Sequence, residues 1–158
     1  MATARPLRLP PRIKVLEALG AIADGRVEKT GDHVYRVVSS EGDRVYRVYV
    51  DPGQGLAYSD DNGTKLRGYV GYPIIAVLML EGVLPYDERL AKALQGIPWR
   101  RLNEKYKRYA LVEAEVKRVA AGKGVAPAEL DAFVEKVMAE LHRLKLRLTT
   151  TLPLDLHK

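Results

Sequence analysis

Two segments whose residue pattern alternates with a period of two, as in a β-strand, most limit the folds that this chain can adopt. They run from His33 to Val38 and from Arg44 to Val50, and the turn-forming stretch 39–43 lies between them. Successive side chains of a strand point to opposite faces of its sheet, so this period predicts a β-hairpin with one half-buried face. We therefore expect an antiparallel sheet here, with a further short strand beginning near Val27.

Apolar residues at helical spacing occupy most of the remaining chain. Several of these segments begin at proline and end at glycine, the usual asymmetry of helix ends. The predicted helices cover about residues 13–22, 74–80, 85–95, 98–121 and 127–148, and a second short strand pair is expected at 56–58 and 65–69. The expected fold class is α+β, a small antiparallel sheet packed with helices and followed by a C-terminal coiled-coil-like helix. The domains expected are a basic domain at residues 1–123 and a dimerising helix at residues 124–158.

Composition excludes several classes of protein and site. The 158 residues include no cysteine and carry a net charge of +6. The missing cysteine excludes disulfides, thiolate-ligated zinc and a cysteine nucleophile. No stretch reaches the roughly 18 apolar residues of a membrane span, and the basic N-terminus lacks the apolar core of a signal peptide, so we expect a cytoplasmic protein without a membrane partner. Few Asn and Gln beside many charges favour a thermophile.

Nearly all of the excess charge lies in one segment. Residues 96–123 hold 8 basic and 3 acidic residues, a balance of +5, whereas residues 124–158 hold 5 of each. A local basic block is typical of a surface that binds polyanions, although a solvated helix face has the same composition. Trp99, Tyr106 and Tyr109 are interleaved with the cations. Such rings offer stacking surfaces for bases, which favours nucleic acid as the partner.

The hairpin carries a second set of rings and cations. Either face of the strand 44–50 presents a tyrosine ring beside a guanidinium. A two-residue turn would place Arg36 opposite Arg47, and a bulged three-residue loop would place Tyr35 there instead. Like charges directly opposite are costly unless an anion bridges them. The alternative interpretation is a core of tyrosine rings with arginines extending into solvent.

These observations define a predicted nucleic-acid surface. The cations expected to neutralise phosphates are Arg36, Arg47, Lys65, Arg67, Arg100, Arg101, Lys105 and Arg108. The rings expected to stack on bases are Tyr46, Tyr49, Tyr69, Trp99 and Tyr106. Each stacked base contributes about 1–3 kcal/mol. The expected function is sequence-tolerant binding of single-stranded DNA, with RNA as the alternative strand.

Apolar residues in the last predicted helix repeat at alternating steps of four and three. They are Leu130, Val134, Val137, Leu141, Leu144 and Leu148. A strict heptad seam is typical of a two-stranded coiled coil, so we expect these residues to form a homodimer. Packing of this helix against the chain's own helices is the alternative.

Few residues suggest catalysis. The three histidines are far apart in sequence, and no P-loop, dinucleotide-binding glycine pattern or zinc-protease motif occurs. Asp60 and Asp61, with Asp51 nearby, could hold Mg²⁺ for a nuclease or phosphatase. The stretch 59–63 also suits a tight turn, in which Asp and Asn bond their own backbone. We expect no enzyme activity, cofactor or metal, and keep an Mg²⁺-dependent nuclease and a protein-interaction module as alternative functions.

The segment that follows the hairpin resembles a SWIM module, a ββα zinc-binding element. In that family a Cys-x-Cys pair precedes a Cys-x-His pair that leads into an apolar helix. The corresponding positions here are Ala57, Ser59, Gly71 and Pro73, so none of the zinc ligands is present. The resemblance implies a metal-free derivative in which apolar packing has replaced zinc.

The plan of the whole chain is similar to that of the ThermoDBP family of archaeal single-stranded DNA-binding proteins. The similarity rests on the Tyr/Arg hairpin, the block Trp99-Arg100-Arg101 and the apolar seam from Leu130 to Leu148. It implies an archaeal, dimeric protein that binds single strands in a cleft of basic and aromatic side chains, with little dependence on sequence.

Overall fold

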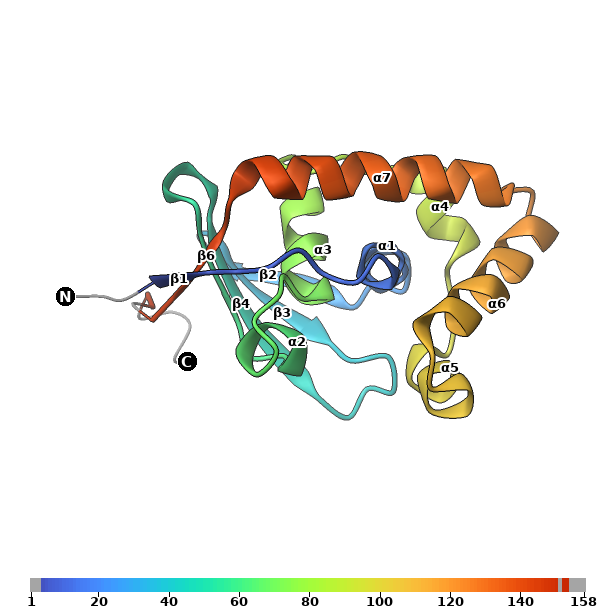
Figure 1. Cartoon of the computed structure of the whole chain (residues 1–158). Helices are drawn as coiled ribbons and strands as arrows, with labels where there is room; N and C mark the ends of the chain where they lie inside the picture. Colours follow the sequence, from blue (N-terminus) through green and yellow to red (C-terminus); the bar gives the residue numbers. More distant parts are fainter. Residues whose placement is uncertain (1–3, 151, 154–158) are drawn as a thin grey trace.

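The computed structural model describes residues 4–150 and 152–153. Within these residues the chain forms one six-stranded sheet, seven α-helices and a 3₁₀ turn at Pro52–Gln54 (Figure 1). The strands are β1 (Ala4–Pro6), β2 (Val27–Gly31), β3 (Val34–Val38), β4 (Val45–Asp51), β5 (Leu56–Ser59) and β6 (Arg147–Thr149). The helices are α1 (Ile13–Ala23), α2 (Asn62–Lys65), α3 (Tyr72–Leu80), α4 (Glu88–Ala93), α5 (Trp99–Tyr106), α6 (Tyr109–Gly122) and α7 (Pro127–Leu144). The predicted α+β class is confirmed, and none of the described helices combines the length and apolarity needed to cross a membrane.

The sheet has the strand order β1-β6-β5-β4-β3-β2. Neighbouring strands are antiparallel except for β5 and β6, which run parallel. The predicted antiparallel sheet is thus present, with one parallel pair that the sequence did not indicate. In the hairpin, Arg36 lies opposite Arg47, the first of the two predicted registers. The connection is nevertheless longer than two residues, because the Ser39 amide donates to the Arg44 carbonyl.

One face of the sheet is covered by two layers of helix. α3 packs on β4 and β5, and α1 packs on α3 (Figure 1). Val48 and Val50 of β4 are completely buried, whereas Arg47, directly before Val48, is exposed. Because side chains alternate along a strand, Arg47 points away from α3. The face carrying Arg36 and Arg47 is therefore the one turned away from these helices.

The basic segment is folded into two helices rather than one. α5 ends at Tyr106. The next residue, Lys107, has a left-handed backbone conformation with φ of 57°, and α6 begins at Tyr109. The predicted single helix over 98–121 is wrong at this point. The break changes the direction of the chain (Figure 1). It lets Val112 and Val116 bury their side chains in the common core.

The predicted dimerisation seam lies inside the chain's own core. Leu130, Val134, Val137 and Leu141 of α7 are each 3% exposed or less. Leu144 is partly buried at the end of α7, and Leu148 belongs to β6 and not to a helix. The prediction of a homodimer through this seam is wrong, because α7 packs on α1 and α6 and leaves no free apolar stripe. The buried apolar residues between Val125 and Leu146 belong to the same core cluster as those before residue 123.

Three short elements differ from the sequence prediction. The segment 65–69, predicted as a strand, contains the end of the helical turn α2. That turn begins after Asp61, whose carboxylate accepts hydrogen bonds from the Thr64 amide and hydroxyl. β1 and β6 were not predicted, and they pair with each other at one edge of the sheet.

Candidate functional site

Two adjoining hollows lie where α1, α5 and the hairpin come together. The larger, of about 320 Å³, is lined by Lys14, Glu17, Arg26, Ser39, Ser40, Tyr46, Tyr72, Trp99, Arg100, Asn103 and Glu104. The smaller, of about 190 Å³, is lined by Lys14, Tyr46, Asp61, Asn62, Gly63, Arg67, Tyr69, Tyr72 and Tyr109. Lys14, Tyr46 and Tyr72 line both, so the two are neighbours, and we call them together the tyrosine groove.

A buried ion pair lies at the centre of the tyrosine groove. The Lys14 ammonium is 3.2 Å from a Glu17 carboxylate oxygen, one turn along α1, and the two side chains are 14% and 5% exposed. Burial alone would lower the pKa of Lys14, but the charge of Glu17 raises it above its usual value. The Lys14 ammonium therefore keeps its proton at neutral pH beside the Glu17 carboxylate.

Tyr46, Tyr69 and Tyr72 of the groove have raised pKa values, and the Tyr72 ring also lies beside a cation. The rings of Tyr46 and Tyr72 meet edge to face with 6.3 Å between centroids, and the Arg26 guanidinium lies 6.0 Å from the Tyr72 ring centre. Burial raises the pKa of Tyr72 and of Tyr46, and raises that of Tyr69 to about 12. All three phenols keep their protons at neutral pH and can act as hydrogen-bond donors.

Trp99 forms the floor of the larger hollow and not an exposed platform. Only 3% of it is exposed, and its indole lies against the backbone of Gly20. A Cβ atom at Gly20 would lie 2.7 Å from the indole nitrogen, so this close approach requires glycine. The prediction that Trp99 stacks on bases at the surface is wrong. Tyr69, at 8% exposed, is also too buried for a surface platform, although it lines the smaller hollow.

The predicted cations fall into separate places. Arg36 and Arg47 lie on the face of the sheet turned away from α3, where Tyr49 of β4 also lies. Arg100 lines the larger hollow and Arg67 the smaller one. The others are Lys65 at the end of α2, Arg101 and Lys105 on α5, and Arg108 just before α6, with the half-buried ring of Tyr106 at the end of α5.

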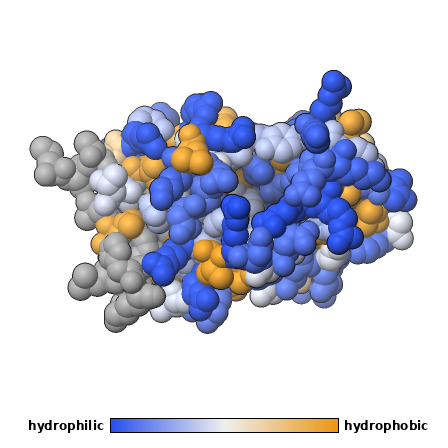
Figure 2. All heavy atoms as spheres, turned by 90° about the horizontal axis from the view of Figure 1, so that it is seen from below, coloured by the Kyte–Doolittle hydropathy of each residue, from blue (hydrophilic) through white to orange (hydrophobic). Residues whose placement is uncertain are grey.

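Acidic partners neutralise part of the basic segment. Arg100 forms a bidentate ion pair with Asp43 of the hairpin loop, and Lys117 and Arg118 pair with carboxylates of α6 and α7. Among the described residues, no ion pair forms to four exposed cations at the turn between α5 and α6. We call these the basic corner: Arg101, Lys105, Lys107 and Arg108. Figure 2, a view from below Figure 1, shows a largely hydrophilic surface on the side of the hairpin tip and α5.

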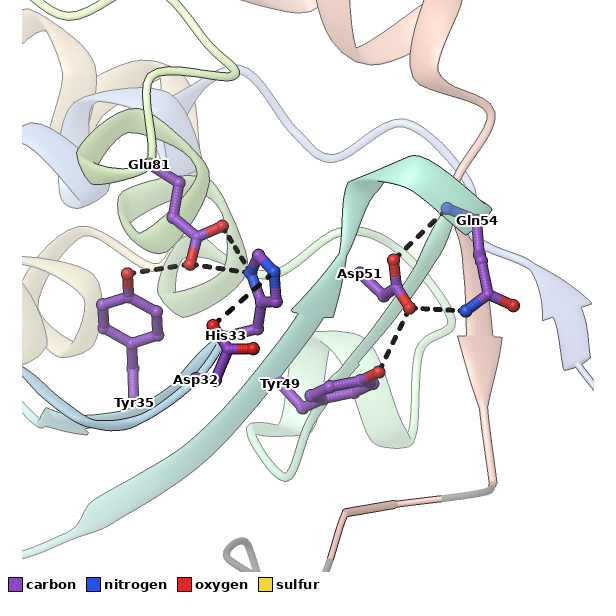
Figure 3. Close-up of polar contacts among 7 residues, drawn as sticks. All are labelled: Asp32, His33, Tyr35, Tyr49, Asp51, Gln54 and Glu81. Carbon is purple, nitrogen blue, oxygen red and sulfur yellow. Dashed lines mark hydrogen bonds and ion pairs between the residues drawn. The ribbon is translucent and has the colours of Figure 1, made fainter.

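The three carboxylates considered for Mg²⁺ each have a structural role. Asp51 accepts hydrogen bonds from the Gln54 amide groups and the Tyr49 hydroxyl (Figure 3). Asp60 accepts from the Arg47 backbone, and Asp61 caps α2. Over residues 4–150 and 152–153, no cluster of three His, Asp or Glu side chains could hold a metal ion.

A second polar cluster joins the sheet to the end of α3. Glu81 accepts a hydrogen bond of 2.8 Å from the Tyr35 hydroxyl and lies 2.9 Å from His33 Nδ1 (Figure 3). His33 has a positive φ of 60° in the turn between β2 and β3. These contacts fix the turn against α3, which is a structural role for His33.

Sequence reasoning did not select several residues of the groove: Lys14, Glu17, Arg26, Tyr72 and Asn103. One signal for two of them was present in the sequence. Lys14 and Glu17 are three residues apart inside an apolar helical pattern, where charged residues are unusual unless they are paired. The other three reach the groove from separate segments, and no spacing rule links them.

One comparison with known proteins gives a match. No curated protein and no solved structure matches the chain. A family model described as "Uncharacterised conserved protein UCP014422" matches residues 7–147, which include every element from α1 to α7. The chain belongs to this family.

Proposed function

We propose that the protein binds single-stranded nucleic acid, DNA in the first instance, along the tyrosine groove and the basic corner. The main support for this proposal is that cations without an ion-pair partner lie beside the partly buried tyrosine rings of the groove. Arg67 lines the same hollow as Tyr46 and Tyr69, and Arg108 directly precedes Tyr109 of that hollow. Proteins that bind single strands without strong sequence preference combine a basic track for phosphates with rings for bases.

The recessed position of the rings favours a single strand over a duplex. The groove rings are half-buried or buried, except Tyr109, which is 42% exposed. In a duplex the flat faces of the bases are stacked on each other, so recessed rings cannot reach them. The bases of a single strand can turn toward the groove while its phosphates stay at the basic corner.

The opposite face of the sheet is a weaker candidate for the same function. Arg36 lies between Arg47 and Glu28 on neighbouring strands, and the Arg47 backbone donates to the Asp60 carboxylate. These acidic neighbours reduce the positive charge of that face. The proposed surface therefore omits Arg36, Arg47 and Tyr49, which were selected from the sequence.

The experiment is a titration of fluorescently labelled single-stranded DNA, followed by anisotropy at several salt concentrations. Five cations, Arg67 and the four of the basic corner, are free to neutralise phosphates. The slope of log K against log salt should therefore be about −3.5, since each phosphate contact contributes about −0.7 on a single strand. Single-stranded RNA and duplex DNA of the same length serve as comparisons. An affinity that does not depend on salt, or no binding at low salt, would refute the proposal.

Matched charge variants locate the surface. Arg67→Ala and Arg108→Ala should each weaken binding and reduce the magnitude of the salt slope by about 0.7. Arg36→Ala and Lys136→Ala remove the same charge from exposed positions on the opposite face of the sheet and on α7, and should leave the slope unchanged. A loss of binding with Arg36→Ala alone would move the site to the sheet face.

A further inference from the structure

Arg100 is a cation of the tyrosine groove whose guanidinium already holds an anionic side chain. It donates two hydrogen bonds to the Asp43 carboxylate, from Nη1 to Oδ2 at 2.7 Å and from Nη2 to Oδ1 at 2.9 Å. The Arg100 backbone amide also donates a long hydrogen bond of 3.4 Å to the Ser40 hydroxyl. In the described part of the chain, Arg100 therefore makes the polar contacts that join the hairpin loop to α5, which lie side by side in Figure 1.

The geometry of this ion pair is one that a phosphate can also adopt. A guanidinium presents two parallel N–H groups, which fit the two oxygens of a carboxylate and the two free oxygens of a phosphodiester. The pair lies at the surface, with the side chains of Arg100 and Asp43 35% and 50% exposed. An exposed ion pair contributes little to stability, so it costs little to replace one anion by another. A phosphate can therefore take the place of the carboxylate on the same two nitrogens.

Asp43 keeps other partners when Arg100 is taken from it. Its Oδ1 atom accepts a 2.9 Å hydrogen bond from the Ser39 hydroxyl, and water reaches the exposed part of the carboxylate. The hydrogen bonds from Arg100 and Ser39 lower the pKa of Asp43 to about 2. The carboxylate is therefore charged throughout the neutral pH range, and it holds Arg100 under the conditions in which a strand would bind.

Arg100 lies between the two parts of the proposed binding surface. Arg101, the next residue of α5, belongs to the basic corner, and Tyr46 lines the larger hollow together with Arg100. A strand that keeps its phosphates on the basic corner and turns its bases toward Tyr46 therefore passes close to Arg100.

We propose that Asp43 competes with a phosphate of the bound strand for the guanidinium of Arg100. Arg100 is then a further phosphate-binding residue, and Asp43 limits the affinity of the site. This inference rests on the proposed function and adds to it a restraint built into the hairpin loop. A phosphate contact at Arg100 requires the release of Asp43, so it adds less to the affinity than a contact to a free cation.

The first test compares two charge variants of the hairpin loop in the anisotropy titration with labelled single-stranded DNA, at one fixed salt concentration. Asp43→Asn removes the charge and keeps an oxygen for the Ser39 hydroxyl. Its affinity for the strand should rise about two- to fivefold, because Arg100 no longer has to leave an anion. Glu41→Gln removes the same charge from an exposed position of the same loop and should have a smaller effect.

The second test repeats both substitutions in an Arg100→Ala background. Without the guanidinium, only the general repulsion between the acidic loop and the strand remains. The gain from Asp43→Asn should therefore fall to that from Glu41→Gln. Melting temperatures close to that of the unsubstituted protein show that each variant is folded, as expected for an exposed ion pair.

The outcomes distinguish this inference from the proposed function. Equal gains from Asp43→Asn with and without Arg100 would overturn the competition, and so would an Asp43→Asn affinity no higher than that of Glu41→Gln. In both cases the salt-dependent binding of the strand persists, so the proposed function stands. No binding of the strand by the unsubstituted protein or by any variant would refute the proposed function and the competition together.

Discussion

The Lys14–Glu17 ion pair links the stability of the fold to the tyrosine groove. Glu17 is 4% exposed, and its carboxylate contacts both Lys14 and the Asn103 amide. We expect Glu17→Gln to lower the free energy of unfolding by about 3–5 kcal/mol, because it leaves a buried ammonium group without its counter-charge. Urea denaturation measures this change.

A double variant is the control for that prediction. Lys14→Met combined with Glu17→Leu removes both charges and keeps similar volume, so it should recover most of the lost stability. A double variant as unstable as Glu17→Gln alone would show that the charge pair itself, and not the unpaired ammonium, determines the loss.

Tyr35 gives the fold a predictable response to alkaline pH. Burial, together with its hydrogen bond to Glu81, raises the pKa of Tyr35 to about 12, against about 10 in an unfolded chain. The folded state keeps a proton that the unfolded chain releases, so this stabilisation is complete below pH 10 and is lost as the pH rises through 12. We expect Tyr35→Phe to make the fall in stability between pH 10 and 12 less steep, as measured by urea denaturation at each pH.

At pH 8 the same variant isolates the hydrogen bond. Tyr35→Phe should lower the free energy of unfolding by about 1.5–3 kcal/mol, the usual contribution of a hydrogen bond to a charged group. Parallel stability curves for the variant and the unsubstituted protein above pH 10 would contradict the proposed origin of the alkaline effect.

At the scale of elements, the turn between α5 and α6 depends on the backbone of Lys107. Its φ of 57° is a conformation that glycine adopts without strain and that costs other residues about 1–2 kcal/mol. Lys107→Gly should therefore raise the free energy of unfolding by about 1 kcal/mol, measured as a higher melting temperature. Lys105→Gly, two residues earlier inside α5, should lower it by a similar amount, because glycine is unfavourable in a helix interior. Two destabilised variants would refute the assignment of strain to Lys107.

Local patterns predicted the elements whose signals lie within one short segment. α1, α3 and the hairpin β3–β4 follow from apolar spacing, proline and glycine positions, and the two-residue period. The break at Lys107 has no such signal, because neither glycine nor proline occurs there. β1 and β6 are three residues long, too short for any period to show.

The heptad seam shows a different limit of sequence patterns. The steps of four and three along α7 correctly predict which side of the helix is apolar, since Leu130, Val134 and Val137 are all buried. The pattern contains no information on which surface covers that side. Here α1 and α6 of the same chain cover it. The apolar side of α7 therefore packs into the chain's own core and not against a second copy of the chain.

At the scale of the whole molecule, the candidate site combines segments distant in sequence. The basic block and the interleaved rings could be predicted because they are properties of composition. The tyrosine groove could not, because Arg26, Tyr46, Tyr72 and Asn103 come from separate elements that meet only in the folded chain. Trp99 shows the consequence, since a ring predicted at the surface lies buried against Gly20 of α1.

The two ends of the described chain are joined through β6, which lies between β1 and β5 in the sheet. The Arg147 amide donates a 2.9 Å hydrogen bond to the Gly55 carbonyl, while the Arg147 side chain is exposed. Arg147→Pro removes this donor, and we expect it to lower the free energy of unfolding by about 1–3 kcal/mol. Arg147→Ala keeps the donor and should change stability by less than about 0.5 kcal/mol.

Hydrogen exchange shows whether this loss spreads through the sheet edge. β1 pairs with β6, and β6 is the strand that connects it to β5. In Arg147→Pro, the β1 and β6 amides that bond across the pair should therefore lose protection together, while the amides of β3 and β4 keep theirs. If β1 stays protected in the proline variant, the N-terminal strand is held by contacts other than β6, such as the backbone hydrogen bonds between Arg8 and residues 68–70. The position of β1 at the edge of the sheet would then depend on the hydrogen bonds of Arg8 and not on its pairing with β6.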